Sequence, residues 1–154
     1  MIRRLNVDDV PKVRDIDRLS FSSGDQYKAE FYEHIESTHE YEPYVATLPN
    51  GTIVGWILGH ATGTTVRIRS ISIHPSFRRR GFARTLIMEI LRRHQTDVDL
   101  VVDPDNVGAL ALYRGLGFTQ TDPDPETPHR IRMLWRPRFS LVETMRFKPF
   151  PSEE

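Results

Sequence analysis

Residues 66–93 constrain the fold more than any other part of the chain. Residues 66–73 alternate apolar and polar side chains, which is the period of a β-strand with one buried face. After Gly81, apolar residues recur at helical spacing, and Arg92 and Arg93 place positive charge where the last helical turn would lie. The sequence therefore predicts a strand, a short arginine-rich loop and an amphipathic helix, in that order.

The loop, Arg78-Arg79-Arg80-Gly81-Phe82-Ala83, has the composition of an anion-binding site. A helix start presents unpaired backbone N–H groups and the positive end of the helix dipole, and together these can hold a pyrophosphate. Glycine lets the backbone approach a phosphate closely, and arginines add charge-assisted hydrogen bonds. The alternative is a solvated loop in which Gly81 is only a turn residue, and the three arginines by themselves favour that alternative.

Further helices are expected in three places. One should begin near Pro11, because Asp9 can cap it and proline is favoured in a first turn. A second is expected around residues 27–35, and a third from Asn106 to residues 115–117. The apolar face of the first would consist of Val10, Val13, Ile16 and Leu19.

Short β-rich runs predict the remaining strands. The turn at Asn50-Gly51 supplies the positive φ angles of a tight hairpin between two of them. We expect strands at residues 2–5, 44–47, 52–60, 98–102, 118–121 and 130–135. The fold class is therefore α/β, with a single mixed central sheet of about seven strands flanked by about four helices. We expect one domain, residues 1–137, and a tail, residues 138–154, of unassigned packing.

Composition excludes several classes of protein. The 21 Lys and Arg residues balance 21 Asp and Glu, so no net charge attracts nucleic acid or an anionic membrane over a distance. The chain has no cysteine, which excludes disulfides and a cysteine nucleophile and fits a reducing compartment. No stretch approaches the ~20 apolar residues of a membrane span, and no His and carboxylate cluster has metal-ligand spacing. We expect a cytoplasmic protein with no metal.

Residues 106–118 form a second segment with chemical interest. Asn106 opens a predicted helix, and Tyr113 precedes a Leu-Gly-Phe ending. The two are seven residues apart, almost two helical turns, so both side chains project from one helix face. They can line one groove, although each is also explained structurally, Asn106 as a helix cap and Tyr113 as a core aromatic.

These two segments resemble the signatures of the GNAT superfamily of coenzyme A-dependent N-acetyltransferases. That family has Gln or Arg, two residues, Gly, one residue, then Gly or Ala, and Arg78, Gly81 and Ala83 fill this pattern. The likeness is strongest over residues 66–118 and is nearest to the ribosomal-protein and N-terminal-alanine acetyltransferases. It implies the acyl-CoA N-acyltransferase fold, acetyl-CoA as cosubstrate, and transfer of an acetyl group to a primary amine.

The resemblance also implies roles for residues. The strand edge at Ile71 and Ile73 would pair with the pantetheine arm and hold the thioester carbonyl. Asn106 would bind the same arm, and the phenol of Tyr113 would act near the sulfur as general acid. A tyrosine of pKa ~10 is a weaker acid than a thiol of pKa ~8.5, so full proton transfer would be uphill by roughly 2 kcal/mol and a hydrogen bond is favoured. The implied cofactor-binding residues are Ile71, Ser72, Ile73, Arg78, Arg79, Arg80, Gly81, Phe82, Ala83, Arg84, Asn106 and Tyr113.

The general base departs from the family pattern. The resemblance places a catalytic glutamate five residues before Asn106, but the chain has Val101 there, and Asp103 is the nearby candidate. At pH 7, freeing a lysine-like amine costs about 4.6 kcal/mol, against roughly 1 kcal/mol for an α-amine. An α-amine needs a base least, so a protein or peptide N-terminus is the expected acceptor, deprotonated through water. Other candidate bases are His74, Glu30, Glu33 and His34.

Three alternatives remain open from the sequence. In the first, the acceptor is a small-molecule amine or a lysine. In the second, the protein binds acyl-CoA as a sensor without turnover, which the missing glutamate permits. Nucleic-acid binding through the arginines is disfavoured by the zero net charge. The expected partner is thus the amine acceptor, with no nucleic acid or membrane, and the protein is expected to be a monomer or a homodimer.

Overall fold

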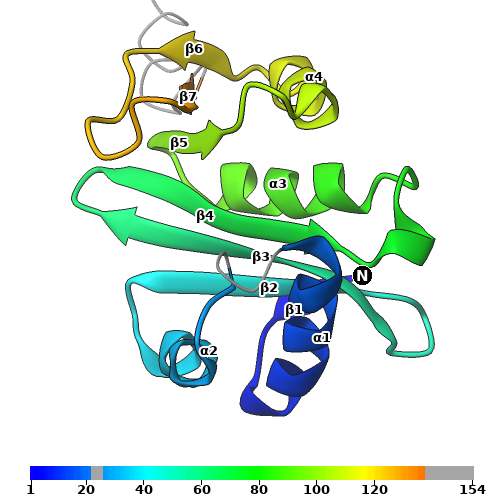
Figure 1. The fold of residues 1–154 in the computed structure, drawn as a ribbon. Helices are drawn as coiled ribbons and strands as arrows, with labels where there is room; N and C mark the ends of the chain where they lie inside the picture. The colour runs from blue at the N-terminus through cyan, green and yellow to red at the C-terminus, as the bar shows by residue number, and fades with distance from the viewer. Residues whose placement is uncertain (22–25, 138–154) are drawn as a thin grey trace, which may run out of the picture.

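One mixed sheet of seven strands runs through residues 1–21 and 26–137, the part of the chain that the computed structural model describes. Four α-helices accompany it in these residues, as the sequence predicted (Figure 1). The tail at residues 138–154 lies outside the described residues. The elements are β1 Ile2–Arg4, α1 Val10–Ser20, α2 Ala29–Ser37, β2 Tyr41–Thr47, β3 Ile53–Thr62, β4 Thr65–Ile73, α3 Phe82–Arg93, β5 Asp97–Val102, α4 Val107–Gly115, β6 Thr119–Thr121 and β7 Ile131–Trp135.

The strand order is β1-β2-β3-β4-β5-β7-β6, and every neighbouring pair is antiparallel except β4 and β5. These two parallel strands pair only over Thr65–Arg67 and Asp97–Asp99. Beyond this point they separate, so the later residues of β4 present an edge that no described strand covers. A sheet edge of this kind exposes backbone N–H and C=O groups to a ligand.

A bulge shapes the free part of β4. Ile68 lies opposite Gly59 and Ser70 lies opposite Leu58, so Arg69 has no partner in β3. The predicted alternation over residues 66–73 is therefore wrong in detail, because the extra residue resets the side-chain period. As a result, Ile71 and Ile73 face the same hydrophobic cluster as Val66 and Ile68.

Two hydrophobic clusters cover the two faces of the sheet. The larger joins the sheet to α3 and α4, with Leu86, Ile87 and Leu110 among its buried residues. The smaller joins it to α1 and α2 around Trp56 and Tyr32. Figure 1 shows the same division, with α3 on one side of β3 and β4 and with α1 and α2 on the other.

Helix α1 departs from its predicted apolar face. Val10, Val13 and Ile16 are buried as expected, but Leu19 is 56% exposed and Asp17 takes a buried place instead. A carboxylate rarely occupies a fully buried position without polar partners, so the surroundings of Asp17 bear on the site described below. None of the helices in residues 1–21 and 26–137 combines the length and the apolar character needed to cross a bilayer.

Candidate active site

The start of α3 is open to an anion. Gly81 occupies the N-cap position at φ +87°, and no side chain caps the helix. The first helical hydrogen bond runs from the Thr85 N–H to the Gly81 carbonyl, 3.0 Å away. The N–H groups of Phe82, Ala83 and Arg84 therefore precede the helical ladder and have no partner within it. A Cβ built on Gly81 would meet nothing within 4 Å, so space lies beside these N–H groups.

A cleft of about 580 Å³ leads from this helix start along β4 to α4. It follows the strand edge that β5 leaves uncovered. Its lining brings together eleven of the twelve residues expected to bind the cosubstrate: Ile71, Ser72, Ile73, Arg78, Arg79, Gly81, Phe82, Ala83, Arg84, Asn106 and Tyr113.

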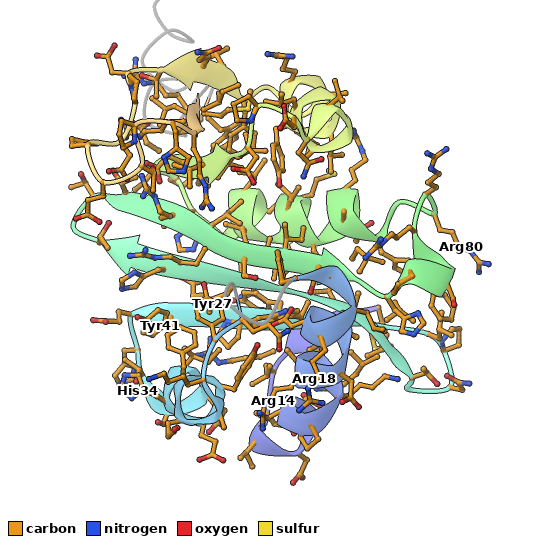
Figure 2. All side chains as sticks on the ribbon, in the orientation of Figure 1. Arg14, Arg18, Tyr27, His34, Tyr41 and Arg80 are labelled. Atoms are coloured by element: carbon orange, nitrogen blue, oxygen red, sulfur yellow. The ribbon has the colours of Figure 1, made fainter. Side chains whose placement is uncertain are left out.

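Arg80, the twelfth, is not among the lining residues. Its guanidinium lies over the Phe77 ring, with the Cζ atom 5.3 Å from the ring centroid. Figure 2 shows the side chain projecting outward from the loop that precedes α3. An extended arginine side chain stacks on an aromatic face while keeping its head in solvent.

Arg78 lines the cleft, and its side chain also connects the loop to two other elements by hydrogen bonds. Its Nε donates to the Ile73 carbonyl at 3.0 Å, and its Nη2 donates to Ser20 Oγ at 3.2 Å. These contacts join the loop to the end of β4 and to the end of α1. Arg79 and Arg84 are exposed and carry their charge on the rim of the same cleft.

Helix α4 places Asn106 and Tyr113 on the cleft together, as their spacing predicted. Asn106 Oδ1 accepts a hydrogen bond from the Ala109 N–H at 3.2 Å, so this residue is a helix cap, and its side-chain NH2 has no partner among the described residues. Tyr113 is 8% exposed, and burial raises the pKa of its phenol. The hydroxyl therefore keeps its proton at neutral pH and can donate it in a hydrogen bond.

A second cavity of about 420 Å³ adjoins the first at Tyr113. The two cavities share Phe21, Ile71, Asn106 and Tyr113 in their linings. Two substrates, one in each cavity, would therefore meet beside these residues. Residues that line only this second cavity include Asp17, Tyr27, Val101, Asp103, Asp124, Glu126 and Arg130.

The candidate bases are placed differently from one another. Asp103 lines the second cavity, where it accepts from Arg130 Nε at 3.1 Å. His74 is engaged as a local cap, since its Nδ1 accepts from the Ser76 N–H at 3.0 Å. Glu30, Glu33 and His34 are exposed on α2 and line neither cavity, and Figure 2 shows His34 beside that helix. Within the described residues, no group of three or more His, Cys, Asp or Glu side chains is placed to hold a metal ion.

An arginine clamp holds the point where β4 and β5 separate. Arg67 donates to both oxygens of Asp99, at 3.0 and 2.8 Å, and to Asp124 at 2.6 Å. Arg132 donates to Asp99 at 2.9 Å. Burial alone would raise the pKa of Asp99, but the two arginines outweigh it and hold that pKa below its usual value. The clamp thus fixes one end of the second cavity and ties the loop that carries Asp124 to the sheet.

Sequence reasoning missed Asp17, Phe21 and Tyr27 as parts of the site. Asp17 is four residues after Val13, so helical spacing alone would have placed it on the buried face of α1. Tyr27 stacks on Phe31, with ring centroids 4.2 Å apart, and its hydroxyl lies 3.4 Å from the Arg69 carbonyl at the bulge. Such long-range contacts have no signal in the sequence. Figure 2 shows Tyr27 between α2 and the strands.

Comparison with known proteins agrees with this geometry. The family model described as Acetyltransferase (GNAT) family matches residues 10–118. The N-alpha-acetyltransferase RimI of Mycobacterium tuberculosis is 31% identical over 116 residues, which cover 71% of this chain and 72% of that protein. The chain spans only 34% of another relative, from Mycobacterium leprae, and 62% of several acetyltransferases from Yersinia pestis.

Solved structures show the same fold. The ribosomal-protein-S18-alanine N-acetyltransferase from Escherichia coli aligns with a TM-score of 0.74 at 20% identity, covering 91% of this chain and 95% of that one. The PaiA N-acetyltransferase from Thermoplasma acidophilum, in complex with coenzyme A, aligns with a TM-score of 0.77 at 18% identity, covering 88% and 98%. The predicted fold class is confirmed.

Proposed function

Because the chain belongs to the acetyltransferase (GNAT) family, we propose that it transfers an acetyl group from acetyl-CoA to a primary amine, by direct attack of the amine on the thioester. The finer proposal is that the acceptor is the N-terminal α-amine of a protein or peptide. The observation that carries the proposal is the pair of cavities that meet at Tyr113, one of them beginning at the uncapped helix start beside Gly81.

The residues of the first cavity fit acetyl-CoA. The N–H groups of Phe82, Ala83 and Arg84 and the helix dipole suit a pyrophosphate, and Arg79 adds positive charge. The uncovered edge of β4 near Ile71 suits the amide groups of the pantetheine arm, as a peptide adds to a sheet edge. A cosubstrate bound in this way would direct its thioester toward Tyr113.

The chain's own side chains then have separate tasks. Asn106 can donate its free amide N–H groups to the carbonyls of the arm while its Oδ1 caps α4. The hydroxyl of Tyr113 can donate to the sulfur as the C–S bond breaks, which stabilises the thiolate without full proton transfer. The walls around Tyr113 include Ile71 and Phe21, and their apolar surface limits the access of water to the thioester.

Two observations support an α-amine as the acceptor. Val101 lines the second cavity at the position where the family resemblance expects a glutamate, so no carboxylate stands at that place. An α-amine near pKa ~7.8 costs only about 1 kcal/mol to deprotonate at pH 7, so it tolerates a weak base. In addition, the similar M. tuberculosis protein is named an N-alpha-acetyltransferase, and the similar E. coli protein is named a ribosomal-protein-S18-alanine N-acetyltransferase.

The test is acetyl-CoA turnover against a matched panel of acceptors. Short peptides with a free N-terminus, the same peptides with a blocked N-terminus and a free lysine, and polyamines would be compared by release of thiol. We expect turnover with free N-termini only, at a rate that rises with the fraction of neutral α-amine. Turnover that follows an amine of pKa near 10, with lysine or polyamine as the best acceptor, would contradict the α-amine proposal.

A further inference from the structure

Asp17 is a buried carboxylate without a role in the acetyl transfer as proposed. It is 1% exposed, on the inner face of α1. Its Oδ1 accepts from Trp56 Nε1 at 2.8 Å and from Ser72 Oγ at 2.7 Å, and its Oδ2 accepts from the Tyr32 hydroxyl at 2.5 Å. Three donors thus meet the two oxygens of this buried carboxylate.

Nothing positive balances this charge in the described residues. Arg14 lies over the ring of Tyr32, 5.9 Å from its centroid, and Arg18 on the same helix pairs with Asp15. No arginine, lysine or histidine of residues 1–21 and 26–137 forms an ion pair with Asp17. A buried carboxylate without a cation is costly, and such groups concentrate where charge is needed for function.

Neighbouring phenols respond to the negative charge at Asp17. Burial and the hydrogen bond with Asp17 raise the pKa of Tyr32 far above its ordinary value. Burial also raises the pKa of Tyr27, Arg69 opposes that change, and the charge of Asp17 adds to it. Both phenols therefore stay protonated at neutral pH, so Tyr32 remains a donor to the carboxylate and does not compete for a proton.

Asp17 and Ser72 connect the linings of the two cavities, the first of which would hold the cosubstrate and the second the acceptor. Asp17 lines the acceptor cavity, and Ser72 lines the cosubstrate cavity beside Ile71. Their side chains are joined by the 2.7 Å hydrogen bond. A hydrogen-bonded pair thus connects the two linings and ends at a buried carboxylate.

Other carboxylates at the acceptor cavity are less available. Asp124 is paired with Arg67, and Asp103 is paired with Arg130. Glu126 has no arginine partner among the described residues but is exposed. Asp17 is therefore the buried carboxylate at this cavity that is not neutralised by an arginine.

We propose that Asp17 receives the proton lost by the acceptor amine, through the hydroxyl of Ser72. The neutral amine attacks the thioester carbon, and its nitrogen becomes positively charged and strongly acidic as the C–N bond forms. One N–H proton passes to Ser72 Oγ while the Ser72 proton moves to Asp17 Oδ1. The C–S bond breaks, the thiolate accepts a hydrogen bond from Tyr113, and the proton on Asp17 later leaves through the cleft to the thiolate or to solvent. Amide and thiol are the products, so atoms and charge balance.

This inference rests on the proposed acetyl transfer, and a matched pair of variants tests it. Ser72→Ala and Tyr32→Phe each remove one hydroxyl that donates to Asp17, and both side chains are buried. Only Ser72→Ala breaks the proposed path. Single-turnover rates, the Kd for acetyl-CoA and urea unfolding midpoints would be measured for both, with Asp17→Asn as a third variant.

We expect Ser72→Ala to lower the single-turnover rate by about 10²-fold, the lower range of general base catalysis, with little change in the Kd for acetyl-CoA. Tyr32→Phe should lower the rate no more than a few-fold, although its urea unfolding midpoint should shift as much as that of Ser72→Ala. The wild-type rate should be slower in heavy water, and Ser72→Ala should lose that isotope effect.

Two outcomes would contradict the inference about Asp17. If Ser72→Ala is as fast as wild type, or if Tyr32→Phe is as slow as Ser72→Ala, the carboxylate is only a structural hub and the inference is wrong. The comparison needs no folded Asp17→Asn protein, since the first two variants decide it. A wild type that acetylates no amine at all would instead overturn the proposed function, and the inference with it.

Discussion

The substitution of Gly81 by alanine tests the backbone conformation at the start of α3, because the added side chain has room there. Gly81 has φ +87°, and an added Cβ would touch nothing within 4 Å, so any cost comes from the dihedral angle. A left-handed conformation costs a non-glycine residue roughly 1–2 kcal/mol. Alanine also restricts the unfolded chain, which returns about 0.4–1 kcal/mol. The free energy of unfolding should therefore fall by about 1 kcal/mol, or about 2–4 °C in Tm for a chain of this size.

Gly63 provides the matched control for this prediction. It lies between β3 and β4 at φ +63°, an added Cβ there also meets nothing within 4 Å, and it lines neither cavity. Gly63→Ala should lose similar stability with no change in acetyl-CoA binding. Gly81→Ala should bind acetyl-CoA about tenfold more weakly. A change in the orientation of the N–H groups that costs about 1.4 kcal/mol of binding free energy is enough for this.

The assays are urea unfolding followed by tryptophan fluorescence, and calorimetric titration with acetyl-CoA. Equal loss of stability with a selective loss of affinity at Gly81 is the expected result. If Gly81→Ala binds acetyl-CoA as tightly as wild type while losing stability, the N–H groups at the start of α3 do not hold the pyrophosphate. An equal loss of affinity in Gly63→Ala would show that the effect is one of general stability.

Four further predictions concern the rest of the site. Tyr113→Phe should lower kcat by about 10²-fold with little change in the Kd for acetyl-CoA, since only the proton donor is lost; an unchanged single-turnover rate would contradict this. Asn106→Ala should lower the free energy of unfolding by about 1 kcal/mol and also weaken acetyl-CoA binding, and calorimetry showing a loss of stability alone would reduce Asn106 to a helix cap. Because Asp99 has a lowered pKa in the folded protein, its contribution to stability is complete above about pH 4 and is lost as the pH falls through the folded value, which acid unfolding should show. Arg67→Met should cost up to about 3 kcal/mol at pH 7, less than a fully unpaired carboxylate because Arg132 remains, and a stability equal to wild type would contradict the clamp.

Local patterns in the sequence predicted the elements well because their causes are local. Apolar residues at helical spacing after Gly81, and the Asn50-Gly51 turn, are determined within a few residues of chain, and α3 and the β2–β3 hairpin follow them. The spacing of Asn106 and Tyr113 likewise placed both on the cleft. Strands β4 and β5 were each predicted for the same reason, without their pairing.

What the sequence did not predict depends on contacts between distant segments. Nothing in residues 98–102 indicates that β5 leaves β4 after Asp99, because strand pairing depends on segments far apart in the sequence. The expectation that all three arginines of the loop face one anion was too simple, since Arg80 stacks on Phe77 and does not line the cleft. The buried position of Asp17 requires Trp56 and Ser72, which lie 39 and 55 residues further along the chain.

The clamp at Arg67 holds a loop that does not line the cosubstrate cavity. Among described side chains, the loop at residues 122–128 is tied to the parallel strands through Asp124, whereas the cosubstrate cavity is built from β4, α3 and α4. The loop contributes to the lining of the second cavity alone, although the two cavities share Phe21, Ile71, Asn106 and Tyr113. Replacing that loop while retaining the aspartate would therefore leave the lining of the cosubstrate cavity intact.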